Sequence, residues 1–571
     1  MTSPVTGRAL HGAGASPGVA VGPVARMAGR VPEPPSGGPA RPPDASAEAR
    51  AALGALQEVA SDLDARAEAA GGEAQEVLEA QAMMAGDPSL AARVEELAGQ
   101  GRLAARAVWE AFAAYRERLA AAGGYLAARV ADLDDVRDRA VALLLGVPVP
   151  GVPDPGYPFV LVAVDLAPAD TATLRRGRVL AFVTEQGGPT SHSAILARAM
   201  GVPAVVGCAG AASLADGTRV VVDGGSGEVL VDPDEATAGV AAAKAEARAA
   251  RLAAAPAARG GHGATADGHR VELLANLGGP ADAAAAVAAG AEGVGLLRTE
   301  FLYLERAAPP SVDEQRDAYA AVFGAFPGGK VVVRTLDAGA DKPLQFLGLP
   351  GEPNPALGER GLRALRRAPE VLADQLDAIG LAAAAGGAEV WVMAPMVTVP
   401  EEAAWFREQA RRLGGRVAKV GVMIEVPAAA LAATALLAEV DFASIGTNDL
   451  AQYAFAADRQ SGALGGFQDP WQPVLLQLVG RVGEAGQAAG RPVGVCGEAA
   501  ADPVLALVLV GLGVTSLSMA ASALADVRLL LARHTLADCR ALAGLALSSP
   551  DAASARSAAR SAANDLDRLG L

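Results

Sequence analysis

The sequence predicts a multidomain α/β protein, in which a small α/β domain with an inserted α-helical bundle is followed by a (β/α)8 TIM barrel. Apolar strand-like runs alternate with helical segments eight times over the last ~300 residues, a pattern typical of this barrel. Nearer the N-terminus, residues 45–145 nearly lack proline and repeat their apolar residues at three- and four-residue spacing. Strand-rich sequence lies on both sides of this region, which predicts an insertion.

The small α/β domain begins with short strand segments and turns over His11–Val24 and resumes after the linker-like residues 146–150. Its later predicted elements are strands at Phe159–Asp165, Arg178–Val183, Ala204–Val206 and Arg219–Asp223, with a short helix at Ala167–Leu174. A helix rich in Ala, Lys, Glu and Arg, at Ala236–Leu252, and a Pro/Gly-rich hinge over 253–264 follow.

The apolar spacing within residues 45–145 predicts long amphipathic helices. Breaks are predicted at Gly71-Gly72, at Gly86-Asp87-Pro88 and at Gly123-Gly124. Such helices serve either as a structural bundle or as a docking platform for another molecule.

The barrel strands are predicted from short apolar runs bounded by turn residues. They are Val271–Leu277, Gly293–Leu297, Val331–Leu336, Val390–Pro395, Val420–Val426, Phe442–Ile445, Pro492–Cys496 and Ser516–Met519.

Composition excludes several classes of protein. The chain has 571 residues and a formal net charge of −16, which argues against a nucleic-acid binder. Its three cysteines, Cys208, Cys496 and Cys539, lie far apart and predict neither a disulfide framework nor a zinc site, so we expect a cytoplasmic protein. The N-terminus lacks the apolar core of a signal peptide. The uncharged run 503–523 contains glycine and hydroxyl residues and predicts a buried helix and a strand, not a membrane span.

One histidine lies at the start of a predicted helix. Gly187-Gly188 follow the strand at 178–183, and His192 precedes the helical run 193–200. The unpaired N–H groups and dipole of a helix N-terminus favour an anion, so this histidine is placed to accept a phosphoryl group. Taken alone, the pattern is equally consistent with a histidine that merely completes a turn.

Polar residues follow most of the predicted barrel strands. In a (β/α)8 barrel the carboxyl ends of the strands form one rim, where active sites lie. Each charged residue alone is explained by solvation or by a salt bridge, but their coincidence at one rim predicts a site. These residues are Arg298-Thr299-Glu300, Arg334, Asp337, Asp341-Lys342, Asn354, Arg360, Arg363, Glu425, Thr447-Asn448-Asp449, Cys496, Glu498 and Ser518.

The residue types indicate the chemistry of this site. Arginines bind phosphate and carboxylate through paired donors. Glu425 and Asp449 would complete a Mg²⁺ site together with phosphate oxygens and water, and Asn448 can donate to a phosphate. Cys496 is either a structural thiol or, in a positively charged site, a proton donor or acceptor.

The motifs together resemble Enzyme I, the phosphoenolpyruvate-protein phosphotransferase of the bacterial sugar phosphotransferase system (PTS). The resemblance covers nearly the whole chain. The matching motifs are ASPGVAVG (15–22), VLEAQAMM (77–84), GGPTSHSAILAR (187–198), AEGVGLLRTEFLYLER (291–306), VVVRTLDAGADKPL (331–344), NPALGERGLR (354–363), GVMIEVPAA (421–429), DFASIGTNDLAQYAFAADR (441–459) and VGVCGEAAADP (493–503).

The resemblance implies roles for individual residues. His192 resembles the phosphorylated histidine, and Cys496 resembles the acid that protonates the departing enolate. Arg298 and Arg334 match ligands of the phosphoenolpyruvate phosphate. Four further residues match positions near the substrate, namely Asn448, Asp449, Arg459 and Lys342. Glu425 and Asp449 match the Mg²⁺ ligands.

The resemblance also implies an organisation and partners. We expect a swivelling phosphohistidine domain, helices that dock the phosphocarrier protein HPr, a linker helix with a hinge, and a phosphoenolpyruvate-binding barrel that forms a homodimer. The expected ranges are 1–34 with 146–235, 35–145, 236–264 and 265–571. Neither nucleic acid nor insertion into a membrane is expected.

Two departures and two alternatives accompany this interpretation. Glu359 stands where a bulky apolar residue is expected, and Gln81 where some relatives have histidine. A pyruvate phosphate dikinase or phosphoenolpyruvate synthase would need an ATP-binding region, and no P-loop precedes His192. A non-enzymatic regulatory relative is the second alternative, against which the intact set of rim residues argues.

Overall fold

The computed structural model describes residues 8–27, 31–36, 44–69, 73–122, 130–147, 149–153, 155–164, 166, 174, 177–188, 192–254, 261–304, 306, 308–338, 344–348, 352, 354–458 and 462–569. The chain forms two compact units. One comprises Met1–Val21, Gln186–Cys208 and Val221–Leu571, and the other comprises Gly22–Glu185 and Ala209–Val220.

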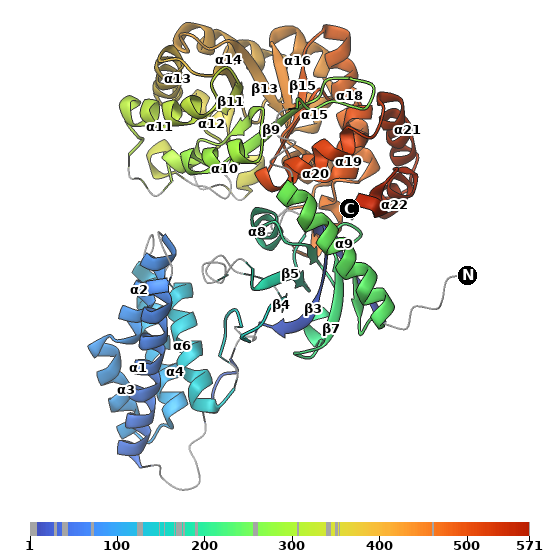
Figure 1. The fold of residues 1–571 in the computed structure, drawn as a ribbon. Coiled ribbons are helices and arrows are strands. Elements are labelled where there is room, and N and C mark those ends of the chain that lie inside the picture. The colour runs from blue at the N-terminus through green and yellow to red at the C-terminus, as the bar shows by residue number, and fades with distance from the viewer. Residues whose placement is uncertain are drawn as a thin grey trace. The chain divides into compact units, whose positions relative to one another are not determined.

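The second unit contains the inserted helical bundle (Figure 1). Its helices are α1 (Ala45–Ala69), α2 (Glu73–Ala85), α3 (Pro88–Gly99), α4 (Ala104–Ala122) and α6 (Val130–Leu145). Apolar side chains at helical spacing form its core, and Leu63, Val108 and Val136 are completely buried.

The predicted break at Gly86-Asp87-Pro88 is confirmed, because Asp87 caps α3 and Pro88 occupies its first turn. A further break between α3 and α4 was not predicted, although Gly101, with φ +86°, is the residue type that commonly follows a helix end. The breaks predicted at Gly71-Gly72 and Gly123-Gly124 lie outside the described residues.

The small α/β region contains one eight-stranded sheet, in the order β1-β8-β7-β3-β4-β5-β6-β2. The strands are β1 (Arg8–His11), β2 (Ala13–Ser16), β3 (Val19–Arg26), β4 (Phe159–Ala163), β5 (Val179–Thr184), β6 (Ala204–Val206), β7 (Arg219–Asp223) and β8 (Glu228–Val231). The predicted strands are present, whereas β8 was not predicted. The predicted helix at Ala167–Leu174 lies almost wholly outside the described residues. Helix α8 (His192–Met200) follows β5, and α9 (Glu235–Ala254) follows β8.

The C-terminal region forms a closed barrel of eight parallel strands, as predicted. The strands are β9 (Glu272–Leu277), β10 (Gly293–Leu297), β11 (Lys330–Arg334), β12 (Glu389–Ala394), β13 (Lys419–Ile424), β14 (Phe442–Ile445), β15 (Val493–Val495) and β16 (Ser516–Met519). Every predicted strand is confirmed to within about two residues at each end, the precision expected of boundary assignments.

Helices surround the barrel (Figure 1). The helices of the C-terminal region are α10 (Ala283–Ala288), α11 (Val312–Ala325), α12 (Leu362–Arg367), α13 (Pro369–Ala384), α14 (Pro400–Leu413), α15 (Pro427–Leu431), α16 (Ala433–Glu439), α17 (Thr447–Phe455), α18 (Pro473–Ala489), α19 (Pro503–Gly511), α20 (Leu524–Leu531), α21 (Leu536–Leu547), α22 (Ala552–Ala562) and α23 (Leu566–Leu569). Those around the barrel include α11, α13, α14, α16, α18 and α19, and α22 packs against α21 and α19. The run 503–523 forms the buried α19 and then β16, as predicted. Among the described residues, no helix combines the length and apolarity that crossing a membrane requires.

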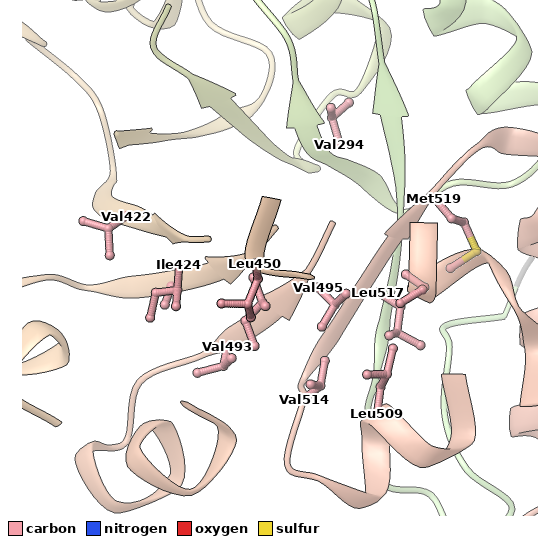
Figure 2. Packing of buried hydrophobic residues seen from close by; sticks show 14 of the residues in the cluster. Val294, Val422, Ile424, Leu450, Val493, Val495, Leu509, Val514, Leu517 and Met519 are labelled. Atoms are coloured by element: carbon pink, nitrogen blue, oxygen red, sulfur yellow. The ribbon is translucent and has the colours of Figure 1, made fainter. Parts of the chain in front are cut away.

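Alternate residues of each strand face opposite sides of the barrel wall. Figure 2 shows the outer set, in which Val493, Val495 and Leu517 meet Leu509 of α19 and Leu450 of α17. The inner set forms a separate cluster of Leu296, Val332, Trp391, Met393, Met423, Phe442 and Cys496. Side chains at the last inward positions therefore reach the carboxyl-terminal rim.

Candidate active site

A chain of buried charges crosses the rim between β11 and α17. Arg334, the last residue of β11, donates from Nη2 to Glu300 Oε1 at 2.7 Å and from Nη1 pairs with Asp337 Oδ2 at 3.2 Å. The same Asp337 oxygen accepts from Arg360 Nη2 at 3.0 Å. Arg360 Nη1 donates to Asp449 Oδ1 at 3.0 Å. The rim residues predicted from β11, from the loop before α12 and from α17 are therefore joined into one network.

Both guanidinium groups remain charged in this network. Burial opposes their charge, but the surrounding carboxylates outweigh burial and raise the pKa of Arg334 and of Arg360 above the usual value. The Nε atoms of both arginines are buried and have no hydrogen-bond partner among the described residues. Buried donors without a partner favour a ligand that would accept from them.

Glu425 follows β13 directly and is 1% exposed. Its Oε1 accepts a hydrogen bond of 2.7 Å from the backbone N–H of Met396. Burial, together with the negative charges of Asp449 and Asp337, raises the pKa of Glu425 to about 8, while Arg334 and Arg360 act in the opposite direction. The site therefore carries a surplus of carboxylates.

Cys496 lies one residue beyond β15 and is 4% exposed. Its Sγ lies 3.6 Å from the Ile445 carbonyl oxygen, and the neighbouring Ser444 side chain acts to lower the thiol pKa. Burial raises the thiol pKa to about 11, so the thiol carries its proton at neutral pH.

Other predicted site residues are more exposed than the buried network or lie outside the described residues. Arg298 follows β10 and is exposed, and Asn448 is partly exposed in the first turn of α17. His192 is the first residue of α8, as predicted, but its side chain is outside the described part of the chain. Lys342 and Arg459 also lie outside it.

The residues present fit a divalent cation. The buried network contains two arginines and four carboxylates, those of Glu300, Asp337, Glu425 and Asp449, so the carboxylates exceed the guanidinium groups. Carboxylate oxygens are the donors that Mg²⁺ prefers, and that ion takes only one or two of them from a protein. The hydroxyl oxygen of Thr447 is also buried, without a partner among the described residues.

Two site residues were missed by the sequence reasoning. Tyr453 accepts from Arg360 Nη1 at 3.2 Å, and its position four residues after Asp449 on a helix was a usable signal. Met396 donates its backbone N–H to Glu425, and the identity of a side chain does not predict such a backbone contact.

A (β/α)8 barrel with buried arginines at its rim is suited to an anionic substrate. Family models define the class of enzyme. Residues 11–129 match "PEP-utilising enzyme, N-terminal", residues 156–227 match "PEP-utilising enzyme, mobile domain", and residues 255–536 match "PEP-utilising enzyme, PEP-binding domain". The chain is a phosphoenolpyruvate-utilising enzyme.

Similar proteins identify the family within this class. A phosphoenolpyruvate-protein phosphotransferase of Streptomyces coelicolor is 59% identical over 555 residues, covering 96% of this chain and 98% of the relative. Proteins of the same name from Haloferax volcanii and Bacillus subtilis are each 41% identical, over 559 and 415 residues, covering 94% and 71% of this chain and 96% and 72% of those proteins. The chain belongs to the phosphoenolpyruvate-protein phosphotransferase family, and the resemblance to Enzyme I is confirmed.

Proposed function

We propose that the enzyme transfers the phosphoryl group of phosphoenolpyruvate to its own His192 and then to a histidine of HPr, releasing pyruvate, as the first step of PTS sugar uptake. The observation that carries the proposal is the buried network from Arg334 through Asp337 and Arg360 to Asp449. It combines fixed cations for an anionic substrate with a surplus of carboxylates for a metal ion.

The substrate binds at the carboxyl-terminal rim of the barrel in this proposal. Arg298 and Arg334 donate to its phosphate, with Asn448, Lys342 and Arg459 nearby. Glu425 and Asp449 would hold Mg²⁺, which when bound would supply positive charge to the phosphoryl group. The pKa of Glu425 is raised to about 8, so its surroundings disfavour the ionised form, and a bound cation would stabilise that form.

His192 accepts the phosphoryl group as a neutral imidazole. A nitrogen–phosphorus bond forms as the bond between phosphorus and the bridging oxygen of phosphoenolpyruvate breaks, and the pyruvate enolate leaves. Cys496 gives its proton to the enolate carbon C3. Its thiol pKa of about 11 supports this role, because the proton is present at neutral pH.

The expected domain boundaries and partners belong to the same proposal. The α/β domain (1–34 and 146–235) swings on the linker and hinge (236–264) between the barrel (265–571) and HPr bound to the helical domain (35–145). On α2 the side chain of Met83 is 71% exposed and is available for contact with a partner. The homodimer through the barrel is what the resemblance to Enzyme I implies. Three free cysteines support a reducing cytoplasmic location.

Mass spectrometry tests the central step. After incubation with phosphoenolpyruvate and MgCl2, the protein gains one phosphoryl group on His192, and the gain does not need ATP. The His192→Ala variant gains none, whereas His262→Ala, at a histidine whose side chain is 79% exposed, gains it normally. A phosphoryl group on His192→Ala would overturn the proposal.

A further inference from the structure

A small cavity lies inside the barrel, on the inward face of its strands. It offers ≈ 20 Å³ to the centre of a water molecule, enough for one water. Three hydroxyl groups line it, those of Ser444 on β14 and of Ser516 and Ser518 on β16, and Lys330 and Trp391 lie among its other walls. A barrel interior is normally filled by bulky apolar side chains, so a cavity lined by hydroxyls is unusual.

Glycines keep this space open. A Cβ atom on Gly494 would lie 2.5 Å from the Ser516 hydroxyl, and one on Gly295 would lie 2.5 Å from the Ser518 hydroxyl. Gly494 is partly exposed although its neighbours Val493 and Val495 are each 1% exposed, so a water-sized sphere reaches the inward face of β15. The interior at this level therefore has both the room and the polar partners that a water molecule needs.

Ser444 connects the cavity to Cys496. Its side chain lines the cavity, and it lies on the strand next to Cys496, since Ser444 pairs with Gly494 and Ile445 with Val495 in the β14–β15 register. It is close enough to the Cys496 thiol to lower the thiol pKa, against the larger effect of burial. Ser444 is itself only 6% exposed. A hydroxyl that contacts water on one side and sulfur on the other can pass a proton between them, because it donates and accepts at once.

We propose that Ser444 relays protons between water in this cavity and Cys496, so that the thiol is re-protonated from inside the barrel and not from the substrate side. The proposal rests on the proposed role of Cys496 as proton donor. When the S–H bond breaks and a C–H bond forms at C3 of the enolate, a thiolate remains. The Ser444 O–H proton moves to sulfur, a cavity water gives a proton to the Ser444 oxygen, and solvent restores the water, so the net change is one proton from solvent to pyruvate.

The surroundings of the cavity support this direction of supply. Lys330 begins β11 at the opposite end of the barrel from the rim and pairs with Glu272 at the start of β9. Burial lowers the pKa of Lys330. The thiolate of a cysteine whose pKa is about 11 is a strong enough base to draw a proton from this side.

The experiment follows carbon and hydrogen exchange in the same sample. The enzyme is incubated in D2O with MgCl2, phosphoenolpyruvate and [2-13C]pyruvate. Movement of 13C into phosphoenolpyruvate reports reversible phosphoryl transfer, and deuterium in the pyruvate methyl group reports exchange of the thiol proton with solvent. In Ser444→Ala the thiol returns the proton that it took from pyruvate, so the ratio of deuterium incorporation to carbon exchange falls by about tenfold or more. Ser444→Thr keeps the hydroxyl and retains the wild-type ratio.

The outcomes separate the relay from the proposed function. Absence of carbon exchange in the wild-type enzyme contradicts the proposed function itself. If carbon exchange proceeds and Ser444→Ala keeps the wild-type ratio of deuterium incorporation to carbon exchange, the relay is wrong and Ser444 is structural. The same conclusion holds if the rates of deuterium incorporation and carbon exchange fall by the same factor.

A second variant covers a Ser444→Ala protein that fails to fold. Gly494→Ala adds a methyl group to the cavity without changing Ser444, and only the movable Ser516 hydroxyl must shift. Displacing the water lowers the same ratio while carbon exchange continues. An unchanged ratio in Gly494→Ala overturns the relay through cavity water.

Discussion

The carboxylate of Glu425 accepts a 2.7 Å hydrogen bond from the backbone N–H of Met396, a residue whose φ is +57°. A left-handed conformation is uncommon for a residue other than glycine and costs on the order of 1 kcal/mol or more. Met396 is 3% exposed, so the surrounding packing holds it there. The left-handed backbone of Met396 is therefore tolerated at a cost in free energy, and its N–H orients Oε1 of Glu425 at the rim.

Glu425 makes the metal-free enzyme less stable as the pH rises. Burial raises its pKa to about 8 from the 4.5 of an ordinary glutamate. Between these values the folded state keeps a proton that the unfolded state has lost, so the free energy of unfolding falls with increasing pH. We expect Glu425→Gln to be more stable than the wild type at pH ~8, by a few kcal/mol at about 1.4 kcal/mol per pKa unit. Urea denaturation in EDTA at several pH values measures the difference.

The difference between the two proteins should vanish near pH 4, where the glutamate is protonated in both states. Glu408→Gln, at an exposed position on α14, provides the control and should change stability little at either pH. A constant difference between Glu425→Gln and wild type across the whole pH range would contradict the raised pKa.

Arg360 holds two buried carboxylates, Asp337 and Asp449, with one guanidinium group. Replacing it by methionine keeps the length of the side chain but leaves both carboxylates without this partner, and removal of one member of a buried ion pair costs roughly 3–5 kcal/mol. We expect a large fall in the free energy of unfolding, together with loss of phosphoryl transfer to His192. Denaturation and mass spectrometry measure the two effects.

Arg367→Met is the matched control for this substitution. Arg367 pairs with Glu359 at 2.9 Å, but its side chain is 52% exposed, and such surface pairs contribute about 0–1 kcal/mol. Equal destabilisation by the two variants would show that the buried network contributes no more than a surface pair.

The sequence predicted the barrel well because its strands are short apolar runs between turn residues, a local signal. It also placed Arg334, Glu425, Asp449 and Cys496 at one rim, because the carboxyl ends of parallel strands meet there. The double pairing of Arg360 was not predictable, since it depends on how a loop folds back over residues distant in sequence. The backbone angle of Met396 was missed because nothing in a methionine side chain encodes a left-handed conformation.

Asp87 stabilises the helical insertion locally. Its carboxylate accepts from the backbone N–H groups of Ser89 and Leu90 at 2.8 and 3.1 Å, at the start of α3. Asp87→Ala should lower the free energy of unfolding by about 1 kcal/mol, and Asp87→Asn by less, because asparagine is also a good N-cap. Phosphorylation of His192 by phosphoenolpyruvate should be unchanged in both variants. A loss of phosphorylation in Asp87→Ala, at unchanged stability, would mean that this helix takes part in the first transfer step.

Cys496 should act as an acid over a wide range of pH. Its thiol pKa is raised by burial to about 11, so the proton remains in place throughout the range in which an ordinary thiol ionises. We expect Cys496→Ala to slow pyruvate formation by about 10²–10⁴, the usual contribution of a positioned acid. The ratio of wild-type to variant rates should stay constant from about pH 7 to about pH 9, because no loss of the thiol proton intervenes. Cys539→Ala, at a cysteine that is fully buried on α21, should leave the rate unchanged and controls for removal of a buried thiol. A ratio that declines as an ordinary thiol ionises would place the Cys496 thiol in contact with water or with a cation, and the buried acid assigned to it would then be wrong.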